Sequence, residues 1–594
     1  MDWTEYFDRK KIVDQAHTII DDIIQSIHLQ ELSIHTRHKL TIDELALLYR
    51  WPIYFSVNTF IERFLRSVYY NKTNVAKHYP SMNYAPRYFR VVGGAASAYY
   101  HNIEINQKLM HDICLVINGK YNGLRMEKDG LPKGENETIS ELLPNKRQHN
   151  FKSGIRFLRR ITLGYVNLLR RKFFMSSIVF ENDKWIKNIF TNINMLPQMP
   201  YNNYAPDYFL RGKIKECCKR AFEKKMVDYI VEFDQSNKDC LLDLFSFWVD
   251  HAIPLSIIEG LGDRFDYYKK ELRGWNVRQV HSCIGYYYSD NLKVFSILAK
   301  RKKAILIAQE HGVNNFVCHF PSPPNITKKL ESIKKPHIHY KGLNEVMFVD
   351  YYCDWGKGKV NDQWDGVEAK LKTKIINTGS VYLSRLNKWK KKDIYQGKFT
   401  VLYVSGPLRD YMANLEEITP EKNFAHRKKV LNFIYKMMQK YSGLEVLYKP
   451  FPGINTLNDP LSEILSAELN QGRVKTTDKK PTELMSEMDV VLFEMISTGF
   501  AEAIQIGVPT LVFSNRFDYE IASEEGKRIN DELEKSGVIF YDQEAGIKSF
   551  GGLVNNLNSF QEASKDPIRQ FQEAVAFPVS AEEFRSKLKK SLVI

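Results

Sequence analysis

The sequence contains few cysteines, and their spacing matches neither a disulfide framework nor a zinc site. Only seven of the 594 residues are cysteine. Cys217 and Cys218 are adjacent, the others are scattered, and no Cys-x-x-Cys pair occurs. Disulfide frameworks and cysteine-ligated zinc sites need recurring, paired spacings. The cysteine pattern therefore argues against both and favours a reducing cytoplasm.

Long apolar runs are also missing. An apolar stretch, residues 241–261, is interrupted by Asp243, Asp250, His251 and Glu259. A membrane-spanning helix needs roughly 18 or more apolar residues in succession. The first residues, MDWTEYFD, lack the apolar core of a secretion signal. We therefore expect a cytoplasmic protein without membrane-spanning helices.

Motifs for metal binding are absent as well. The sequence has no Asp-x-Asp after a strand in a nucleotide-like context and no His-x-x-x-His. If a phosphate is bound, we expect lysine, arginine and helix dipoles to neutralise it rather than a required Mg²⁺. The sequence thus predicts no metal site and no cofactor.

Positive charge is in excess. Lysine and arginine together number 85 and aspartate and glutamate 70, which gives a formal net charge of +15. Such an excess favours anionic partners, among them nucleotides, phosphates, acidic sugars, nucleic acid and anionic membranes. The charge is spread along the chain, and no zinc finger, RNP-like strand or compact basic–aromatic module occurs. We therefore expect no nucleic-acid partner.

The length and the patterning of the chain predict several domains. A chain of 594 residues is too long for one ordinary domain. Residues 1–170 are mainly helical in pattern, and from about residue 276 strands alternate with helices. We divide the chain after residue 170 into Rossmann-like domains at 171–390 and 391–564, near a lysine-rich linker at 387–398. Such alternation predicts parallel sheets with helices on both faces. The expected strands are residues 277–284, 304–308, 347–353, 374–377, 400–405, 445–448, 490–493, 509–513 and 538–541.

Parallel sheets bind ligands at the carboxyl ends of their strands, so the loops after the strands are the places to search. The most informative loop follows residues 490–493 and contains Ser497, Thr498 and Gly499 before a helix. Free N–H groups at a helix start attract an anion, two hydroxyls add donors, and glycine permits close approach. Glu502, one turn later, would accept hydrogen bonds from ribose hydroxyls. The alternative is that Ser497 or Thr498 only caps the helix.

Two further loops carry weaker signals for phosphate. Lys449 follows the strand at 445–448 and precedes a proline, so a stiff loop presents a point charge suited to a diphosphate. Gly406 and Arg409 follow the strand at 400–405, where a glycine turn can lie against a phosphate. The alternatives are a surface lysine and an ordinary turn.

The catalytic candidates lie in the first half of the alternating region. Glu310 and His311 end the strand at 304–308. Histidine is the usual general acid or base near neutral pH, and a neighbouring carboxylate acts as base or orients it. Glu259, in a largely apolar segment, is a third candidate that would line an acceptor cleft. The alternatives are a structural histidine and a glutamate without a role.

One stretch mixes basic and apolar residues at helical spacing, residues 156–174. This pattern is typical of a helix lying on an anionic membrane surface. The ordinary alternative is a packed amphipathic helix with a solvated basic face.

Five short segments occur in a fixed order along roughly the second half of the chain. They are 308–312 (AQEHG), 349–356 (VDYYCDWG), 378–380 (TGS), 449–452 (KPFP) and 497–503 (STGFAEA). In this order they resemble a GT-B family of bacterial surface-polysaccharide transferases. This family groups with capsule and O-antigen sugar transferases, CMP-Kdo and nonulosonate transferases, and CDP-glycerol glycerophosphotransferases.

The chain departs from the family pattern at two places. The family's Gln-His-Gly is interrupted here by Glu310, which leaves open whether Glu310 or His311 faces the substrate. The histidine that often follows Lys-Pro is replaced by Phe451. Glycerophosphotransferases use that histidine on phosphate, so its loss weighs against glycerol-phosphate transfer.

The resemblance implies a GT-B-like fold, in which two Rossmann-like domains face each other across a cleft and a C-terminal helix from 565–594 crosses back. It implies metal-independent glycosyl transfer from a nucleotide-sugar donor to a glycan or lipid-linked acceptor in capsule or lipopolysaccharide assembly. The favoured donor is a CMP-activated nonulosonic acid or Kdo, and the enzyme would contact the inner-membrane surface. A CDP-glycerol-type polyol-phosphate transferase and a non-enzymatic polyanion-binding scaffold remain alternatives.

Overall fold

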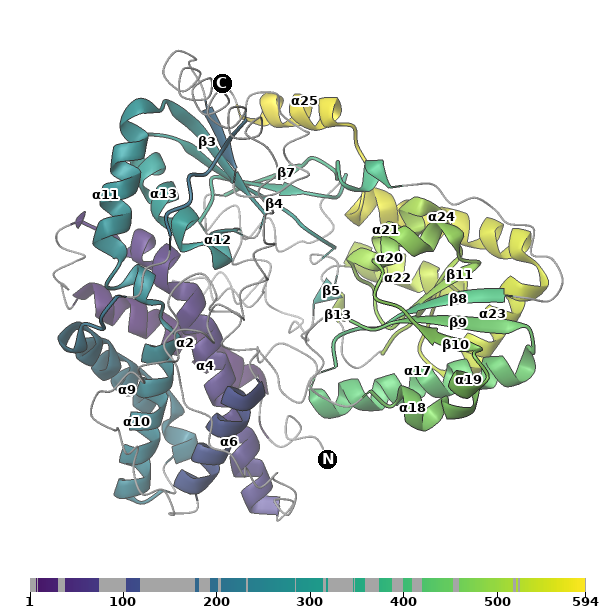
Figure 1. Cartoon of the computed structure of the whole chain (residues 1–594), viewed down its shortest axis with the longest axis horizontal. Coiled ribbons are helices and arrows are strands. Elements are labelled where there is room, and N and C mark those ends of the chain that lie inside the picture. Colours follow the sequence, from purple (N-terminus) through teal and green to yellow (C-terminus); the bar gives the residue numbers. More distant parts are fainter. Residues whose placement is uncertain are drawn as a thin grey trace, which may run out of the picture.

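The fold comprises a helical part and two parallel sheets (Figure 1). The computed structural model describes residues 7, 9–29, 38–73, 103–117, 177–180, 193–200, 204–230, 233–283, 285–313, 317–318, 346, 348–357, 373–386, 399–408, 419–451, 459–515, 520–521 and 524–592. The basic segment 156–174 and the linker 387–398 lie outside these residues.

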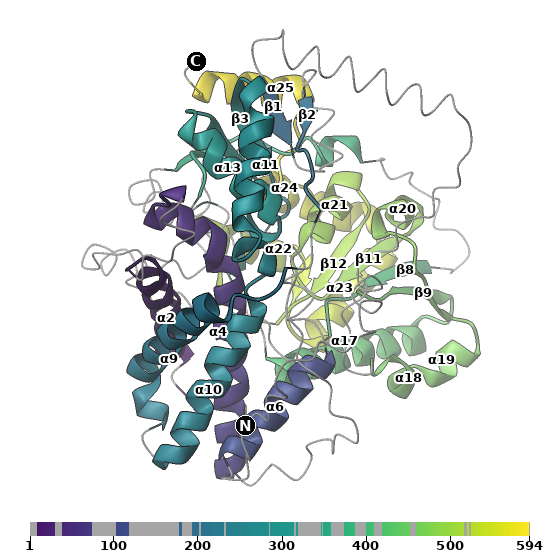
Figure 2. The ribbon, with the colours of Figure 1, turned by 60° about the vertical axis from the view of Figure 1, so that its left-hand side comes forward.

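The helical part is built from two separate stretches of sequence. The helices between residues 208 and 252 pack against the helices between residues 9 and 117 (Figure 2). One apolar core joins this bundle to the neighbouring sheet, so the helices and the first sheet form one body. None of the described helices is long and apolar enough to cross a membrane. The packed helices are α2 (Arg9–Leu29), α4 (Ile42–Thr73), α6 (Ile103–Ile117), α9 (Tyr208–Ile230) and α10 (Gln235–Ala252).

The long helix α4 shows how local sequence sets an element boundary. The Thr41 amide donates to Glu44 Oε2 at 2.9 Å, and the Glu44 amide donates to Thr41 Oγ1 at 3.3 Å. This reciprocal pair is a capping box, which satisfies two amides that the helix start would leave open. Asp43 and Glu44 also place negative charge in the first turn, where the helix dipole favours it.

The first sheet is parallel, with strand order β2-β1-β3-β4-β6-β7. The helices α11 (Leu261–Glu271), α12 (Gly285–Tyr288) and α13 (Asp290–Arg301) lie beside it (Figure 1). Four strands match expected segments within a few residues, whereas β1 and β2 were not expected. The strands are β1 (Ser177–Phe180), β2 (Ile193–Met195), β3 (Val277–Ser282), β4 (Ile305–Gln309), β6 (Tyr351–Asp354) and β7 (Lys374–Asn377).

The second sheet is also parallel, with order β10-β9-β8-β11-β12-β14. Its central strands are buried along their length, as in parallel strands covered on both faces. From β8 the chain adds strands first on one side and then, from β11, on the other. The strands are β8 (Phe399–Val404), β9 (Leu444–Lys449), β10 (Val474–Thr476), β11 (Val490–Phe493), β12 (Thr510–Phe513) and β14 (Ile539–Phe540).

Helices cover both faces of this second sheet (Figures 1 and 2). Doubly wound sheets of this kind form a crevice where the strand order reverses, here at the carboxyl ends of β8 and β11. The main helices are α17 (Pro420–Lys440), α21 (Thr498–Ile506), α22 (Glu524–Lys535), α23 (Gln543–Asn555) and α24 (Leu557–Val575).

The end of the chain returns to the first sheet. The Phe577 amide donates to the Trp355 carbonyl at 2.9 Å, and the Ser380 amide donates to the Phe577 carbonyl at 2.7 Å. The helix α25 (Ala581–Ser591) then packs beside β7, and its Phe584 and Leu588 are buried there (Figure 1). A second link pairs β5 (Val317–Cys318) with β13 (Glu520–Ile521).

The predicted fold class is confirmed. The chain has two Rossmann-like domains, each with a six-stranded parallel sheet, and a helical extension. The C-terminal segment connects the second domain back to the first.

Candidate functional site

The start of α21 lies where the strand order of the second sheet reverses. Ser497 occupies the N-cap position in an extended conformation, but its side chain makes no capping hydrogen bond. Ser497 and Thr498 are both partly exposed. The capping alternative therefore does not describe Ser497. The first-turn amides of α21 therefore do not donate to the Ser497 side chain, and free amides at a helix start favour an anion.

Gly499 has a packing reason to be glycine. A Cβ at this position would come within 2.9 Å of the Phe493 ring, closer than side-chain carbons approach one another. The absent side chain lets the first turn of α21 lie directly against the end of β11. Glycine here sets the position of the helix start that the sequence had indicated for phosphate.

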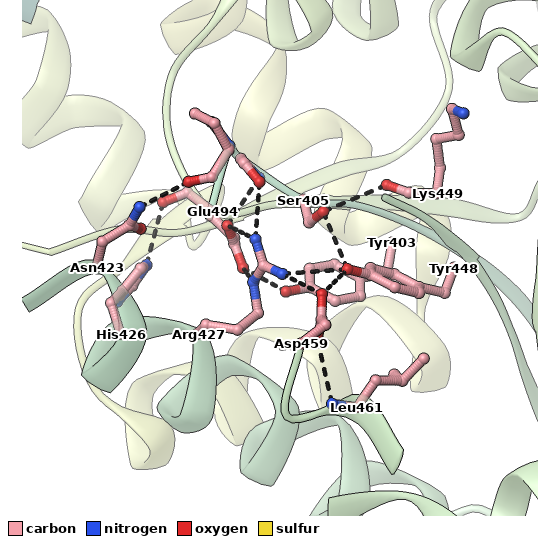
Figure 3. Close-up of polar contacts among 12 residues, drawn as sticks. Tyr403, Ser405, Asn423, His426, Arg427, Tyr448, Lys449, Asp459, Leu461 and Glu494 are labelled. Atoms are coloured by element: carbon pink, nitrogen blue, oxygen red, sulfur yellow. Dashed lines mark hydrogen bonds and ion pairs between the residues drawn. The ribbon is translucent and has the colours of Figure 1, made fainter. Parts of the chain in front are cut away.

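A buried polar network lies under the strand ends (Figure 3). Glu494, the first residue after β11, is almost fully buried and accepts a hydrogen bond from the Gly406 amide at 2.8 Å. The same carboxylate accepts short hydrogen bonds from the Tyr403 hydroxyl and the Arg427 guanidinium. Glu494 thus ties the loop after β8 to the loop after β11 through the helix α17.

Arg427 is the centre of this network (Figure 3). Its guanidinium is buried and also donates to the Gly406 carbonyl at 2.8 Å and to Asp459 Oδ2 at 2.6 Å. Asp459 follows β9 along the chain and accepts a short hydrogen bond from the Tyr448 hydroxyl. One arginine therefore holds the ends of three neighbouring strands together, because each strand or its following loop supplies a partner.

Electrostatics keep the members of the network in defined protonation states. Burial alone would raise the pKa of Glu494, but the adjacent Arg427 charge and its hydrogen bonds lower the pKa below the ordinary range. Burial raises the pKa of Tyr403 and of Tyr448 well above that of a free tyrosine. Glu494 therefore stays an anion and both tyrosines stay hydrogen-bond donors near neutral pH.

The other phosphate candidates on this sheet differ in their surroundings. The Gly406 amide is committed to Glu494, so it does not point at a ligand. Lys449 is only 6% exposed, yet among the described residues no carboxylate pairs with its ammonium. Figure 3 shows its side chain extending away from the Arg427 network. Arg409 lies outside the described residues.

In the first domain, the two residues of the interrupted Gln-His-Gly segment differ in exposure. Glu310 is buried, and its Oε2 accepts a hydrogen bond from the Trp355 amide at 2.7 Å. His311 is exposed. Val313, two residues later, packs into the core of the second domain. The His311 loop therefore lies at the junction of the two domains.

Glu502 also lies at that junction. The Tyr382 hydroxyl, from the loop after β7, donates to Glu502 Oε1 at 2.5 Å. Burial raises the pKa of Glu502, and the Tyr382 hydrogen bond partly opposes this shift.

Glu259 has a different environment from the other candidates. Arg211 donates to its Oε1 at 2.6 Å and to its Oε2 at 2.8 Å, and the Asp207 amide also donates to Oε1 at 2.9 Å. Arg211 is buried and pairs with Asp250 as well. Both oxygens of Glu259 are thus engaged in an ion cluster of the helical part. The structure does not bring it together with the strand-end loops.

Sequence reasoning found the loops but missed the Arg427 network beneath them. Arg427 lies among the buried, mostly apolar positions of α17, and a charged residue on that face was the available signal. Among the described residues, no group of three or more histidines, cysteines or carboxylates is placed to hold a metal ion.

Residues 335–546 match the model of the LIC12162 family transferase. The match covers a little over one third of the chain and contains the Trp355 segment, Tyr382, the Arg427 network and α21. The predicted enzyme class, a transferase, is confirmed over this region. No curated protein matches the chain.

Solved structures match the chain at low identity and low TM-score. UDP-GlcNAc 2-epimerase from Neisseria meningitidis bound to UDP-GlcNAc is 13% identical, covers 70% of this chain and 100% of its own, and has a TM-score of 0.35. Medicago truncatula UGT71G1 complexed with UDP-glucose is 9% identical, covers 70% of this chain and 94% of its own, and has a TM-score of 0.28. Because both TM-scores are low, the fold assignment rests on the two sheets themselves.

Proposed function

We propose that the protein is a glycosyltransferase of bacterial surface-glycan assembly that binds a nucleotide-activated sugar at the carboxyl edge of the second sheet. The match of residues 335–546 to a transferase family carries this proposal. The uncapped start of α21 supports it, because this helix begins at the crevice where doubly wound sheets bind ligands.

We assign the following roles to the residues of the site. The amides at the start of α21, together with Ser497, Thr498 and Lys449, hold the donor phosphate. The phosphate gains negative charge as its bond to the sugar breaks, and the helix dipole and the lysine stabilise that charge without a required metal. His311 takes the proton of the acceptor hydroxyl, since Glu310 is committed to the Trp355 amide.

The finer specificity is proposed from the resemblance and from charge. We favour a CMP-activated nonulosonic acid or Kdo as donor, because a chain of net charge +15 suits an acidic sugar. The acceptor would be a glycan or lipid-linked saccharide of capsule or lipopolysaccharide, reached at the inner-membrane surface. A CDP-glycerol-type transferase would instead add a phosphodiester, which the mass of the product distinguishes.

A thermal-shift screen of the purified protein tests the proposal. The protein is scanned with CMP, CDP, UDP, GDP and dTDP, each with and without EDTA. A ligand that binds only the folded state raises the melting temperature. A shift with one nucleotide that survives EDTA supports a metal-independent donor site. No shift with any of them contradicts the proposal and favours the polyanion-binding scaffold, whose binding would fall steeply with salt.

We expect His311→Ala to lower the transfer rate by roughly 100-fold or more, since general-base catalysis contributes on that order. The nucleotide-induced thermal shift should remain, because His311 is assigned to the acceptor and not to the donor. The assay measures product formation as the release of nucleotide from the donor that the screen identifies. His111→Ala, at an exposed position of α6, is the control. An unchanged rate for the His311 variant removes this residue from the mechanism.

A further inference from the structure

A tyrosine of the first domain holds a carboxylate of the second. The Tyr382 hydroxyl donates to Glu502 Oε1 at 2.5 Å, and both side chains are partly buried. Glu502 lies in α21, one turn after Ser497 and Thr498, whereas Tyr382 follows β7 of the other sheet. The contact therefore links the first domain directly to the helix that begins at the proposed donor site.

The second oxygen of Glu502 is available to a ligand. Among the described residues, Glu502 Oε2 has no hydrogen-bond partner. It is also absent from the buried polar atoms that lack a partner, which means that it is accessible to solvent. One oxygen is thus fixed by Tyr382 while the other reaches solvent. This is the arrangement needed to accept a hydrogen bond from a hydroxyl in a defined direction.

Tyr382 is itself held by the segment that positions the His311 loop. Its ring stacks on Trp355, with ring centroids 6.2 Å apart and planes 27° apart. The Trp355 amide donates to Glu310, the neighbour of His311. Trp355 and Val313 also share an apolar core with Phe500 of α21. A continuous set of contacts therefore runs from His311 through Trp355 and Tyr382 to Glu502.

We propose that Tyr382 is a positioning residue that orients Glu502 toward the ribose hydroxyls of the donor, so that the donor is read correctly only when the two domains are docked. This inference rests on the proposed function, in which the donor is a nucleotide bound beside α21. It adds a residue of the first domain to donor recognition, and in it Trp355 holds that residue in place.

The test compares a ribonucleotide with its analogue lacking the ribose hydroxyls. Dissociation constants of CMP and 2′,3′-dideoxy-CMP are measured by calorimetry for the wild type, Tyr382→Phe and Glu502→Gln; if the screen selects UDP, the UDP pair is used. The wild type should prefer the ribonucleotide by roughly 10-fold, the scale of a hydrogen bond to a charged group. Tyr382→Phe keeps the ring and its stacking, and should reduce this preference to about 3-fold or less.

The ratio separates positioning from general damage. A loosened fold weakens both ligands alike and leaves the ratio unchanged, and that result would overturn the inference. Glu502→Gln should also lose the preference, which keeps the test decisive if the tyrosine variant folds poorly. Tyr435→Phe removes a hydroxyl from a side chain of α17 that is 39% exposed and should behave as the wild type.

The two proposals fail in different ways. If the wild type binds no nucleotide, the proposed function fails and the role of Tyr382 fails with it. If the wild type binds nucleotide but does not distinguish the two analogues, or if Tyr382→Phe still distinguishes them, only the role of Tyr382 is overturned.

Discussion

At the scale of single residues, the Arg427–Glu494 pair is the part of the candidate site that depends most on burial. Both side chains are nearly inaccessible to solvent. Removing charges from water is costly, and such a pair repays the cost only when its remaining donors and acceptors are satisfied. Here Tyr403, the Gly406 amide and Asp459 complete the hydrogen bonding. The network is therefore better understood as fixing the loop geometry than as a source of net stability.

We expect Arg427→Met to destabilise the second domain by about 3–5 kcal/mol, because Glu494 would be left as a buried, uncompensated charge. Urea unfolding at neutral pH measures the change. The neighbouring Lys428 makes an exposed ion pair with Glu463, at 2.9 Å. Lys428→Met should therefore change the stability by less than about 1 kcal/mol. Equal effects of the two substitutions would contradict the assignment of a buried, coupled pair.

A second residue-scale prediction concerns pH. Burial lowers the pKa of His281, on β3, to about 3. Between that value and the ordinary value near 6.5 the unfolded chain binds a proton that the folded chain does not, so stability falls as the pH falls. The slope from this one group is about 1.4 kcal/mol per pH unit. His281→Gln should flatten the dependence of unfolding free energy on pH between about 6.5 and 4. An unchanged slope would show that His281 is protonated in the fold.

At the scale of elements, two helix starts with serine differ in what the serine does. Ser289 caps α13, because its hydroxyl accepts a hydrogen bond from the Leu292 amide at 3.2 Å. Ser497 makes no such hydrogen bond to α21. Ser289→Ala should cost about 1 kcal/mol of stability and leave nucleotide binding intact. Ser497→Ala should cost less than about 0.5 kcal/mol but weaken nucleotide binding several-fold. Thermal unfolding with and without the nucleotide measures both quantities, and the reverse outcome would show Ser497 to be an ordinary cap.

The elements that could be predicted from the sequence are those with strong local patterns. The strand Val490–Phe493 was expected at the observed residues, since a run of four large apolar residues is buried on both faces. The helix α17 begins at Pro420, because Thr419 caps it and proline is favoured in the first turn. The strands β1 and β2 were missed because they precede residue 276, where the alternation of strands and helices begins, and the helices α9 and α10 separate them from the rest of their sheet.

In the candidate site, too, the local features could be predicted from the sequence and the long-range contacts could not. The loops after the strands follow from topology, so Ser497, Lys449 and Gly406 were identified as candidates. Arg427 and Glu494 are 67 positions apart in the sequence, and their pairing exists only once α17 packs over the ends of β8 and β11. No local pattern reveals such a contact. Tyr382 was missed for the same reason, since its partner Glu502 is 120 positions away.

At the scale of the whole molecule, the first domain is completed by residues that come after the second domain in the sequence. The C-terminal segment leaves the second domain and completes the apolar core beside β7 of the first, where Val579, Phe584 and Leu588 join Ile376 and Tyr351. The same crossing runs beside Trp355, whose carbonyl accepts the Phe577 amide. Docking of the domains, the Trp355–Tyr382 contact and the stability of the first sheet are therefore physically connected.

This connection predicts that a substitution near the C-terminus destabilises a strand some two hundred positions earlier. Phe584 is 2% exposed, and truncating such a ring to alanine costs about 3–5 kcal/mol. We expect Phe584→Ala to increase hydrogen exchange at β7 and β6 while α17 and β9 keep their protection, because those elements belong to the other core. Arg585→Ala, at the neighbouring position outside that apolar cluster, is the matched control. If exchange rises uniformly over both sheets, the two domains unfold as one unit and α25 is not a separate support of the first.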